Sequence, residues 1–363
     1  MEVYIKPLMQ CNLRCVYCYE QGNLSNRRVL SLTENRLILR RVKTYAIKEG
    51  IQELQLAFTG GEFLMLGPQY LGRLLALSRR TFRGAEIDLQ IVIQTNLTLL
   101  NAEYIRIFKK YKVSVGSSYD VIGGLRRFQN GLPIDKIMLD KIISLFRAKM
   151  RFYGIAVITK SNYRQAKSLH RFYKDIYSDF HVLPLDAASE KYCPQEKISV
   201  KQYIQALKTM AREQLKGKKV ISVSTVDGYA ELLWKGPGAG GSCLFSKQCL
   251  GRRIFIQNDG EVYPCDCLRG DKFRLGNIFK DPLEKMLSRP ILSKLKGRQA
   301  YIDKQCQGCK YLPLCNGGCM ISAYEEDGNI LKRSRRWCRI NRAMFKYVGK
   351  LLKRRREKLF IQV

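Results

Sequence analysis

Histidine is scarce in this chain of 363 residues, and the marks of a membrane or secreted protein are missing from it. Its two histidines, His170 and His181, cannot supply a histidine-rich metal site. No apolar run approaches the roughly 18 residues of a membrane-spanning helix, and the N-terminus lacks the charged and apolar regions of a signal peptide. We therefore expect a soluble, cytoplasmic protein with no membrane partner.

Acidic residues are also few. The 31 Asp and Glu stand against 65 Lys and Arg, which gives a formal net charge of +34. A charge of this size favours an acidic partner, such as nucleic acid, a membrane surface or an acidic peptide. The cations are scattered, with local runs at 216–219, 332–339 and 353–358, and scattered cations are typical of a solvated surface.

Cysteine, in contrast, is abundant, and its number, 13, is odd. Without a secretory signal, a disulfide framework explains these cysteines poorly. Metal ligation by thiolates is the better explanation, and nine of the 13 cysteines lie beyond residue 235.

The first two-thirds of the chain alternate short β-branched runs with amphipathic helical stretches, which indicates a parallel sheet, open or curled into a partial barrel. The predicted strands are Val3–Lys6, Leu54–Thr59, Leu89–Gln94, Ser114–Tyr119, Tyr153–Ile158 and Phe180–Leu185. The predicted helices are Glu34–Glu49, Gln69–Thr81, Ala102–Lys110, Asp135–Met150, Tyr163–Ile176 and Val200–Leu215.

This pattern ends at a glycine-rich linker, Gly236–Gly241. The cysteine-rich segment after it cannot bury much apolar surface, so we expect it to fold around metal. A basic helix over Asn341–Leu359 closes the chain. The predicted domains are 1–235, 236–340 and the terminal helix at 341–363.

Cys11, Cys15 and Cys18 form a CxxxCxxC motif directly after the first predicted strand. Three thiolates on one loop can hold three corners of an iron–sulfur cubane and leave the fourth iron open for reaction. A zinc site or a redox pair is the alternative, although zinc normally takes a fourth ligand and none stands nearby in the sequence.

The motif resembles the signature of radical S-adenosylmethionine (radical SAM) enzymes, with the aromatic Tyr17 before the last cysteine. The resemblance continues in Thr59-Gly60-Gly61-Glu62, Gln94-Thr95-Asn96 and Ser118-Tyr119-Asp120. Each of these segments falls at the C-terminal end of a predicted strand, where parallel sheets place their sites. The implied fold is a partial (βα)6 barrel, and the implied chemistry is hydrogen abstraction by a 5′-deoxyadenosyl radical.

The resemblance also implies roles toward S-adenosylmethionine (SAM). Tyr17 would lie near the adenine, and Gly60, Gly61 and Glu62 would hold the amino group. Ser118 and Arg126 would contact the ribose or the carboxylate, and Gln94 would belong to the same site. Arg127 is an equally available neighbour of Arg126, and Val121 departs from the family by standing where a glycine commonly follows the aspartate.

The cysteines beyond the linker resemble the SPASM extension of these enzymes, in which a GxxxxC element is followed by CxxCxxxxxCxxxC and one distant cysteine. Structural zinc is the alternative. The resemblance implies two auxiliary 4Fe-4S clusters with all four ligands from protein, and three clusters in all, for electron relay or structure. One ligand set would be Cys243, Cys249, Cys265 and Cys319, and the other Cys306, Cys309, Cys315 and Cys338. Cys193, a small buried residue or a thiol near the substrate, and Cys267 remain.

Asp266, directly after Cys265, lies in a stretch that resembles the anaerobic sulfatase-maturating enzymes, which oxidise a cysteine or serine of a partner protein to formylglycine. In that branch the equivalent aspartate is the candidate catalytic base, and a turn carboxylate is the alternative. Cys267 departs from the branch, because an aromatic tends to occupy its position.

We therefore expect a radical SAM/SPASM maturase that modifies a peptide or protein. Because of Cys267 and the positive charge, the preferred substrate is a ribosomally made peptide precursor that receives a thioether or other crosslink, and a sulfatase is the second. The electron donor would be a flavodoxin or ferredoxin. An RNA-modifying or RNA-binding protein is the alternative from another class, favoured by the charge alone, and a plain electron carrier would leave Gly60–Glu62 unexplained.

Overall fold

The computed structural model describes residues 1–121, 124–185, 187–216, 220–239, 243–246 and 250–361. Within these residues no helix is long and apolar enough to cross a membrane. The chain divides into two compact units, each built from segments that are distant in the sequence. Unit 1 comprises Met1–Ser118, Gly124–Tyr153 and Leu250–Lys294, and unit 2 comprises Tyr119–Gly123, Gly154–Cys249 and Leu295–Val363.

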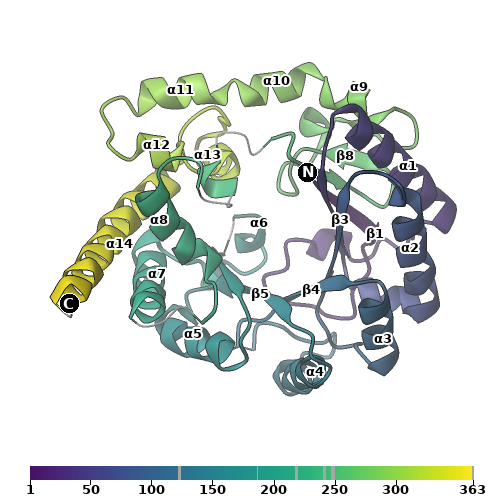
Figure 1. Ribbon diagram of the computed structural model, residues 1–363, viewed down its shortest axis with the longest axis horizontal. Coiled ribbons are helices and arrows are strands. Elements are labelled where there is room, and N and C mark those ends of the chain that lie inside the picture. The colour runs from purple at the N-terminus through teal and green to yellow at the C-terminus, as the bar shows by residue number, and fades with distance from the viewer. Residues whose placement is uncertain (122–123, 186, 217–219, 240–242, 247–249, 362–363) are drawn as a thin grey trace. The chain divides into compact units, whose positions relative to one another are not determined.

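Unit 1 is built on a sheet whose first four strands are parallel, in the order β4-β3-β2-β1 (Figure 1). A late strand, β7, adds to β1 in parallel, and β8 and β9 continue antiparallel. The strands are β1 (Glu2–Leu8), β2 (Glu53–Gly60), β3 (Asp88–Thr95), β4 (Val113–Ser118), β7 (Arg253–Ile256), β8 (Glu261–Tyr263) and β9 (Gly276–Asn277). Because β7 pairs with β1, residues near 260 are brought beside the loop that follows β1.

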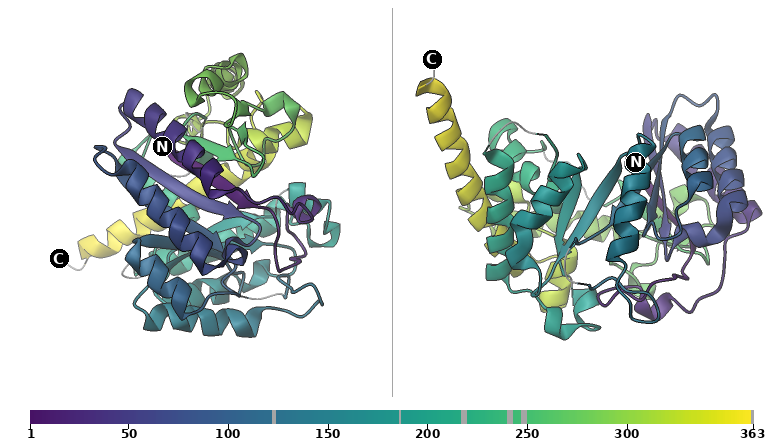
Figure 2. Two further views of the ribbon diagram at one scale, coloured as in Figure 1. Left: turned by 90° about the vertical axis from the view of Figure 1, so that its right-hand side faces the viewer. Right: turned by 90° about the horizontal axis from the view of Figure 1, so that it is seen from below.

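Helices cover this sheet through apolar faces. The longer helices are α1 (Leu32–Lys48), α2 (Gly67–Phe82), α3 (Ala102–Lys110) and α4 (Asp135–Arg147). Two short helices come later in the chain, α9 (Leu283–Leu287) and α10 (Pro290–Lys296). Ser31 and Glu34 close a capping box at the start of α1, as their spacing predicts. The two helices α1 and α2 pack against each other, and Figure 2 shows them side by side.

Unit 2 holds a second pair of parallel strands and most of the remaining helices. The strands are β5 (Phe152–Ile158) and β6 (Phe180–Pro184), and the helices are α5 (Ala166–Asp175), α6 (Ala187–Glu190), α7 (Val200–Leu215), α8 (Ser224–Lys235), α11 (Arg298–Gln305), α12 (Leu312–Cys315), α13 (Met320–Asp327) and α14 (Arg335–Ile361). The long α14 packs on α7 and α8.

The parallel α/β class predicted from the sequence is confirmed, and all six predicted strands are present as β1 to β6. The terminal helix begins at Arg335, six residues before the predicted start. Helix α8 was not predicted from the sequence. The boundaries proposed at residues 235 and 340 stay a prediction.

Candidate functional site

The loop after β1 carries the three clustered cysteines. Backbone hydrogen bonds fix it to the segment after β4, because Arg14 N–H donates to Arg127 O over 2.7 Å and Val16 N–H donates to Leu125 O over 2.8 Å. Cys11, Cys15 and Cys18 are half-buried and lie close enough to interact electrostatically. The CxxxCxxC loop thus presents three thiols as one group.

The environment of this group suits thiolates bound to a cationic centre. Burial raises the pKa of Cys11 to about 12 and that of Cys18 to about 11, so the free thiolates are disfavoured until a cation accompanies them. Donors already point at Cys11 Sγ: the Leu13 N–H at 3.4 Å and Asn96 Nδ2 at 3.8 Å. Three thiols that need a cation and have hydrogen-bond donors fit an iron–sulfur cluster.

The Gly60-Gly61 pair lets β2 approach the cysteine loop closely. A Cβ on Gly60 would lie 2.2 Å from Leu8 O, and one on Gly61 would lie 2.0 Å from Gln10 O. Gly60 also has φ of +128°, which favours glycine. Any larger residue would push the cysteine loop away, so these glycines set the loop's position.

Glu62 is fully buried and engaged within the protein. Its carboxylate accepts hydrogen bonds from Leu64 N–H (2.9 Å), Thr95 Oγ1 (2.6 Å) and Asn96 N–H (2.6 Å). Burial raises its pKa, although these three donors oppose the shift. Glu62 therefore ties the end of β2 to the end of β3, where Asn96 reaches Cys11.

Two further pairs of predicted SAM residues are brought together. Gln94 Nε2 donates to Ser118 Oγ over 3.1 Å, at the ends of β3 and β4. The guanidinium of Arg126 lies 5.3 Å from the centre of the Tyr17 ring. Arg127 is exposed instead and donates to Gly124 O, so the structure distinguishes the two arginines that the sequence left equivalent.

Asp266 lies in a buried network of two cations and two carboxylates. The Lys6 ammonium contacts both Asp266 and Glu20, and Lys6 and Glu20 are 1% and 3% exposed. Arg269 also bridges the two carboxylates, with 2.7 Å from Nη1 to Glu20 Oε2 and 2.7 Å from Nη2 to Asp266 Oδ1. Tyr19 donates its hydroxyl to Asp266 Oδ2 over 2.8 Å.

This network keeps Asp266 ionised. Burial alone would raise the pKa of the carboxyl group, but the charges of Lys6 and Arg269 and the hydrogen bonds from Lys6 and Tyr19 lower it to about 2. Glu20 responds in the same way, since the hydrogen bond from Arg269 and the charge of Lys6 outweigh its burial. The loop after Cys18 and the loop after Cys265 are thus joined by balanced charges.

The thiols of Cys265, Cys267 and Cys193 differ in exposure. Cys265 is half-buried, and a hydrogen bond from Cys267 lowers its pKa against the effect of burial. Cys267 itself is exposed. Cys193 is fully buried and donates to Ser189 O over 3.4 Å, as expected of a small buried residue.

Four of the late cysteines, Cys306, Cys309, Cys315 and Cys338, lie close together in unit 2, where each interacts electrostatically with others of the set. Burial raises the pKa of Cys306 and Cys315. The sulfur atoms of the group accept hydrogen bonds, with 2.9 Å from Arg333 Nη1 to Cys338 and 3.2 Å from Asn341 Nδ2 to Cys315. The donor set fits a cluster with four thiolate ligands.

Three of the four cysteines of the other proposed ligand set lie within the described residues. Cys243 and Cys319 belong to unit 2 and Cys265 to unit 1, while Cys249 lies outside the described residues. Among the residues that the structure describes, no three His, Cys, Asp or Glu side chains are grouped as ligands of a single metal ion.

Sequence reasoning missed the partners of these groups. Lys6, Glu20 and Arg269 were not among the predicted site residues, and neither was Asn96 as a donor to Cys11. A local signal for Lys6 is its position between Ile5 and Pro7, in a short run of mostly apolar residues.

Comparison with known proteins agrees with this geometry. Residues 5–123 match the radical SAM superfamily, and residues 243–310 match SPASM, an iron–sulfur cluster-binding domain. A cysteine-type anaerobic sulfatase-maturating enzyme of Clostridium perfringens is 26% identical, over 96% of both chains. A serine-type enzyme of Bacteroides thetaiotaomicron is 27% identical over 87% of this chain and 82% of its own.

Solved structures show the same fold. The structure of anSMEcpe with bound AdoMet and the Cp18Cys peptide has a TM-score of 0.83 at 23% identity, over 97% of this chain and 98% of the other. Streptococcus suis SuiB bound to its precursor peptide SuiA has a TM-score of 0.66 at 18% identity, over 93% of this chain and 75% of the other.

The fold and the cysteine sites define an iron–sulfur enzyme of the SAM-dependent class. The chain carries a radical SAM domain and a SPASM domain, and over nearly its whole length it resembles the anaerobic sulfatase-maturating enzymes. It is therefore a radical SAM/SPASM maturase that uses SAM and 4Fe-4S clusters.

Proposed function

We propose that this enzyme oxidises a cysteine or serine side chain of a protein substrate to formylglycine. The observation that carries this proposal is the match to a cysteine-type sulfatase-maturating enzyme over 96% of both chains. The comparisons do not specifically support a peptide crosslink, which Cys267 and the positive charge favour. Cysteine- and serine-type relatives are about equally similar, at 26% and 27% identity, so the proposal includes both side chains.

The predicted residues have three tasks, which are to hold the clusters, to position SAM and to accept a proton. Cys11, Cys15 and Cys18 hold the SAM-binding cluster, and the remaining eight ligands hold two auxiliary clusters. Tyr17 with Arg126, Gln94 with Ser118, and Gly60, Gly61 and Glu62 position SAM. When bound, SAM and the clusters supply a 5′-deoxyadenosyl radical and an acceptor for one electron, with a flavodoxin or ferredoxin as the donor.

Asp266 then has the task of taking the substrate's proton. Removing a hydrogen atom from the β-carbon leaves a radical beside the sulfur or oxygen, and loss of one electron and one proton completes the C=S or C=O bond. For cysteine, water then replaces sulfur and hydrogen sulfide leaves. The proton becomes strongly acidic once the electron is lost, so even a carboxylate whose pKa is about 2 can accept it.

The position of Asp266 supports this assignment. Lys6 and Arg269 both engage Oδ1, whereas Oδ2 meets only the Tyr19 hydroxyl among the contacts in the described network. Tyr19 is 39% exposed, so this side of the carboxylate is nearer to solvent than Lys6 and Glu20 are. The protein thus orients one oxygen inward and leaves the other toward the open side.

The test compares two peptides that differ only in Cys or Ser at the target position, incubated with reconstituted enzyme, SAM and reductant. Mass spectrometry after carbonyl capture should show formylglycine from at least one of them. A product that has lost two hydrogen atoms but carries no reactive carbonyl would favour a crosslink and overturn the proposal.

An Asp266→Asn variant tests the base. It should still cleave SAM but form product at least ~10²-fold more slowly, as expected when a general base is removed. Because Asn leaves an excess buried positive charge near Lys6 and Arg269, cluster content and folding must be checked in the same preparation. Product at the wild-type rate from a folded variant would make Asp266 a structural carboxylate.

A further inference from the structure

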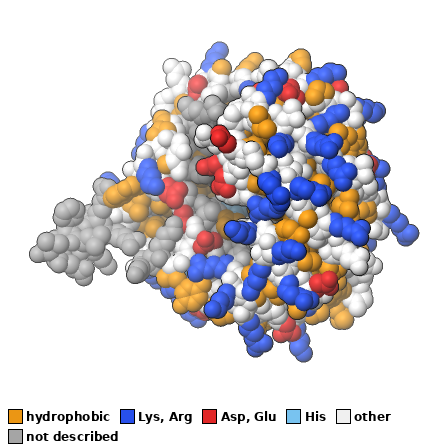
Figure 3. Space-filling view, turned by 45° about the vertical axis from the view of Figure 1, so that its right-hand side comes forward, with side chains coloured by type: hydrophobic (Ala, Val, Ile, Leu, Met, Phe, Trp, Pro, Cys, Tyr) orange, Lys and Arg blue, Asp and Glu red, His pale blue; other side chains and the backbone are white. Residues whose placement is uncertain are grey.

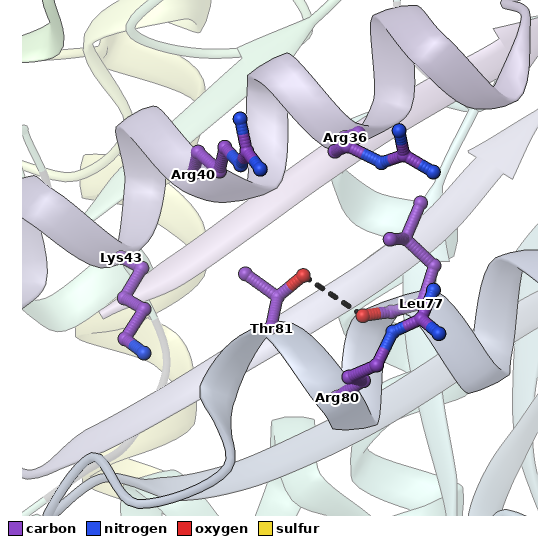
Figure 4. A pocket seen from close by; sticks show the side chains of 6 residues that line it. All are labelled: Arg36, Arg40, Lys43, Leu77, Arg80 and Thr81. Carbon is purple, nitrogen blue, oxygen red and sulfur yellow. Dashed lines mark hydrogen bonds between the residues drawn. The ribbon is translucent and has the colours of Figure 1, made fainter.

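A groove between α1 and α2 is lined by unpaired cations. Its volume is about 400 Å³, and its lining residues are Arg36, Arg40, Lys43, Leu77, Arg80 and Thr81. Figure 4 shows the first three on α1 facing the other three on α2, with the Thr81 hydroxyl turned back to Leu77 O. None of these residues belongs to the cysteine loops or to the predicted SAM site.

The cations of this groove differ from neighbouring arginines on the same helices. Arg41 on α1 donates to Asp281 O, and Arg79 on α2 donates to Leu89 O at 2.8 Å and to Tyr111 O at 2.7 Å. These two arginines therefore link neighbouring segments of the fold through hydrogen bonds to backbone carbonyls. The four groove cations, in contrast, form no ion pair or side-chain hydrogen bond within the part of the chain that the structure describes.

Four like charges around one groove repel each other, so their arrangement costs stability unless an anion binds. Arg36, Arg40 and Lys43 follow each other at i, i+4 and i+7, which places successive cations about 6 Å and 4.5 Å apart along the helix axis. Alternate side chains of an extended peptide point to the same side at a spacing of about 6.6 Å. The two spacings are close enough for carboxylates on alternate residues to meet successive cations.

We propose that this groove binds an acidic segment of the protein substrate in extended form, away from the side chain that is modified. A peptide is favoured over nucleic acid because no aromatic residue lines the groove, and single-stranded nucleic acids are held largely by base stacking on aromatic rings. Figure 3 shows blue Lys and Arg side chains spread over the displayed face. The whole face therefore attracts an acidic chain at long range, and the groove is the site at which we expect that chain to bind.

The inference rests on the proposed function only in taking the substrate to be a protein. Binding is therefore measured apart from turnover, with the holoenzyme and a fluorescent probe peptide that alternates Glu and Ser. The groove variant is R36Q/R40Q/K43Q/R80Q. The matched control, R73Q/R106Q/K109Q/R147Q, also removes three arginines and one lysine, all exposed on helices α2, α3 and α4.

The groove variant should lose about tenfold or more in affinity, from the sum of four charge contacts at exposed or half-buried side chains, while the control should change less than about twofold. Turnover of a short substrate peptide without an acidic segment should be the same in both. Raising the salt from about 0.05 to 0.5 M should remove the difference between wild type and groove variant, because screening acts on exposed charges.

Equal losses in both variants would show that only net charge matters and would overturn the proposal. So would a single-stranded RNA of the same charge that binds more tightly than the peptide and depends on the same four residues. If the wild-type enzyme modifies no cysteine or serine peptide yet binds the acidic probe through the groove, the proposed function is wrong. The proposal that the groove binds an acidic segment is then still supported.

Discussion

The ammonium group of Lys6 contacts the carboxylate of Asp266, although 260 positions separate the two residues in the chain. Lys6 lies in β1, which leads into the loop of Cys11, Cys15 and Cys18, and Asp266 follows Cys265. The pair becomes close because β7 joins the sheet beside β1. One ion pair therefore connects a strand of the radical SAM domain with a loop of the SPASM domain.

Breaking this pair should be costly. Lys6→Met keeps the length of the buried side chain but leaves Asp266 and Glu20 with Arg269 as their only cation in the network. The free energy of unfolding should fall by about 3–5 kcal/mol, as for other buried charges that lose a partner. Chemical denaturation followed by circular dichroism measures the loss, and Lys43→Met, at a less buried lysine on α1, is the control. A loss no larger than the control's would mean that the network contributes little.

Arg126 and Arg127 should differ in SAM binding. Arg126 stacks on Tyr17 and affects Cys18 electrostatically, whereas Arg127 is exposed. Arg126→Gln should weaken SAM binding about tenfold, within the range of a partly desolvated cation–π contact, and Arg127→Gln should change it less than about twofold. Anaerobic calorimetry on the reconstituted enzyme compares them, and equal effects would remove Arg126 from the SAM site.

Asn341 should tune the auxiliary cluster that we propose for Cys306, Cys309, Cys315 and Cys338. Its amide donates to Cys315 Sγ over 3.2 Å and is itself oriented by Tyr229, whose hydroxyl donates to Asn341 Oδ1 over 2.7 Å. Such donors stabilise the more negative, reduced cluster, so Asn341→Leu should lower the reduction potential by about 50 mV. Redox titration followed by EPR measures it, with the exposed Asn329→Ala as control. An unchanged potential would show that this hydrogen bond does not tune a cluster.

Val121 should tolerate glycine. It adopts φ of +67° directly after Asp120, a conformation that costs a β-branched residue about 1–2 kcal/mol. Val121→Gly should therefore leave the melting temperature unchanged or raise it, since relief of strain offsets the ~0.5–1 kcal/mol that glycine usually costs. The same substitution at Val157, in strand β5, should lower the melting temperature. A clear loss at Val121 would show that its side chain contributes packing that outweighs the strain.

The sequence predicts the parts of this enzyme that depend on local pattern. The strands β1 to β6 and the cysteine loops follow from short-range periodicity and spacing. Helix α8 is missed because Thr225, Val226 and Gly228 lower its helix propensity, and packing against α14 stabilises it instead.

The residues that contact a site residue are harder to predict from the sequence than the site residue itself. The resemblance singles out Asp266, but no pattern near residue 266 indicates Lys6, because their contact depends on the pairing of β7 with β1. Similarly, the sequence treats Arg126 and Arg127 as equivalent, and only the folded backbone directs one of them to Tyr17.

The most direct measurement follows the hydrogen atom that leaves the substrate. A substrate peptide deuterated at the β-carbon of its target cysteine or serine is incubated with the reconstituted enzyme and SAM. The account predicts deuterium in the 5′-deoxyadenosine and formylglycine in the peptide, with neither formed by a variant in which Cys11, Cys15 and Cys18 are all replaced by Ala. Formylglycine without deuterium in the 5′-deoxyadenosine, or product from the triple variant, would contradict it.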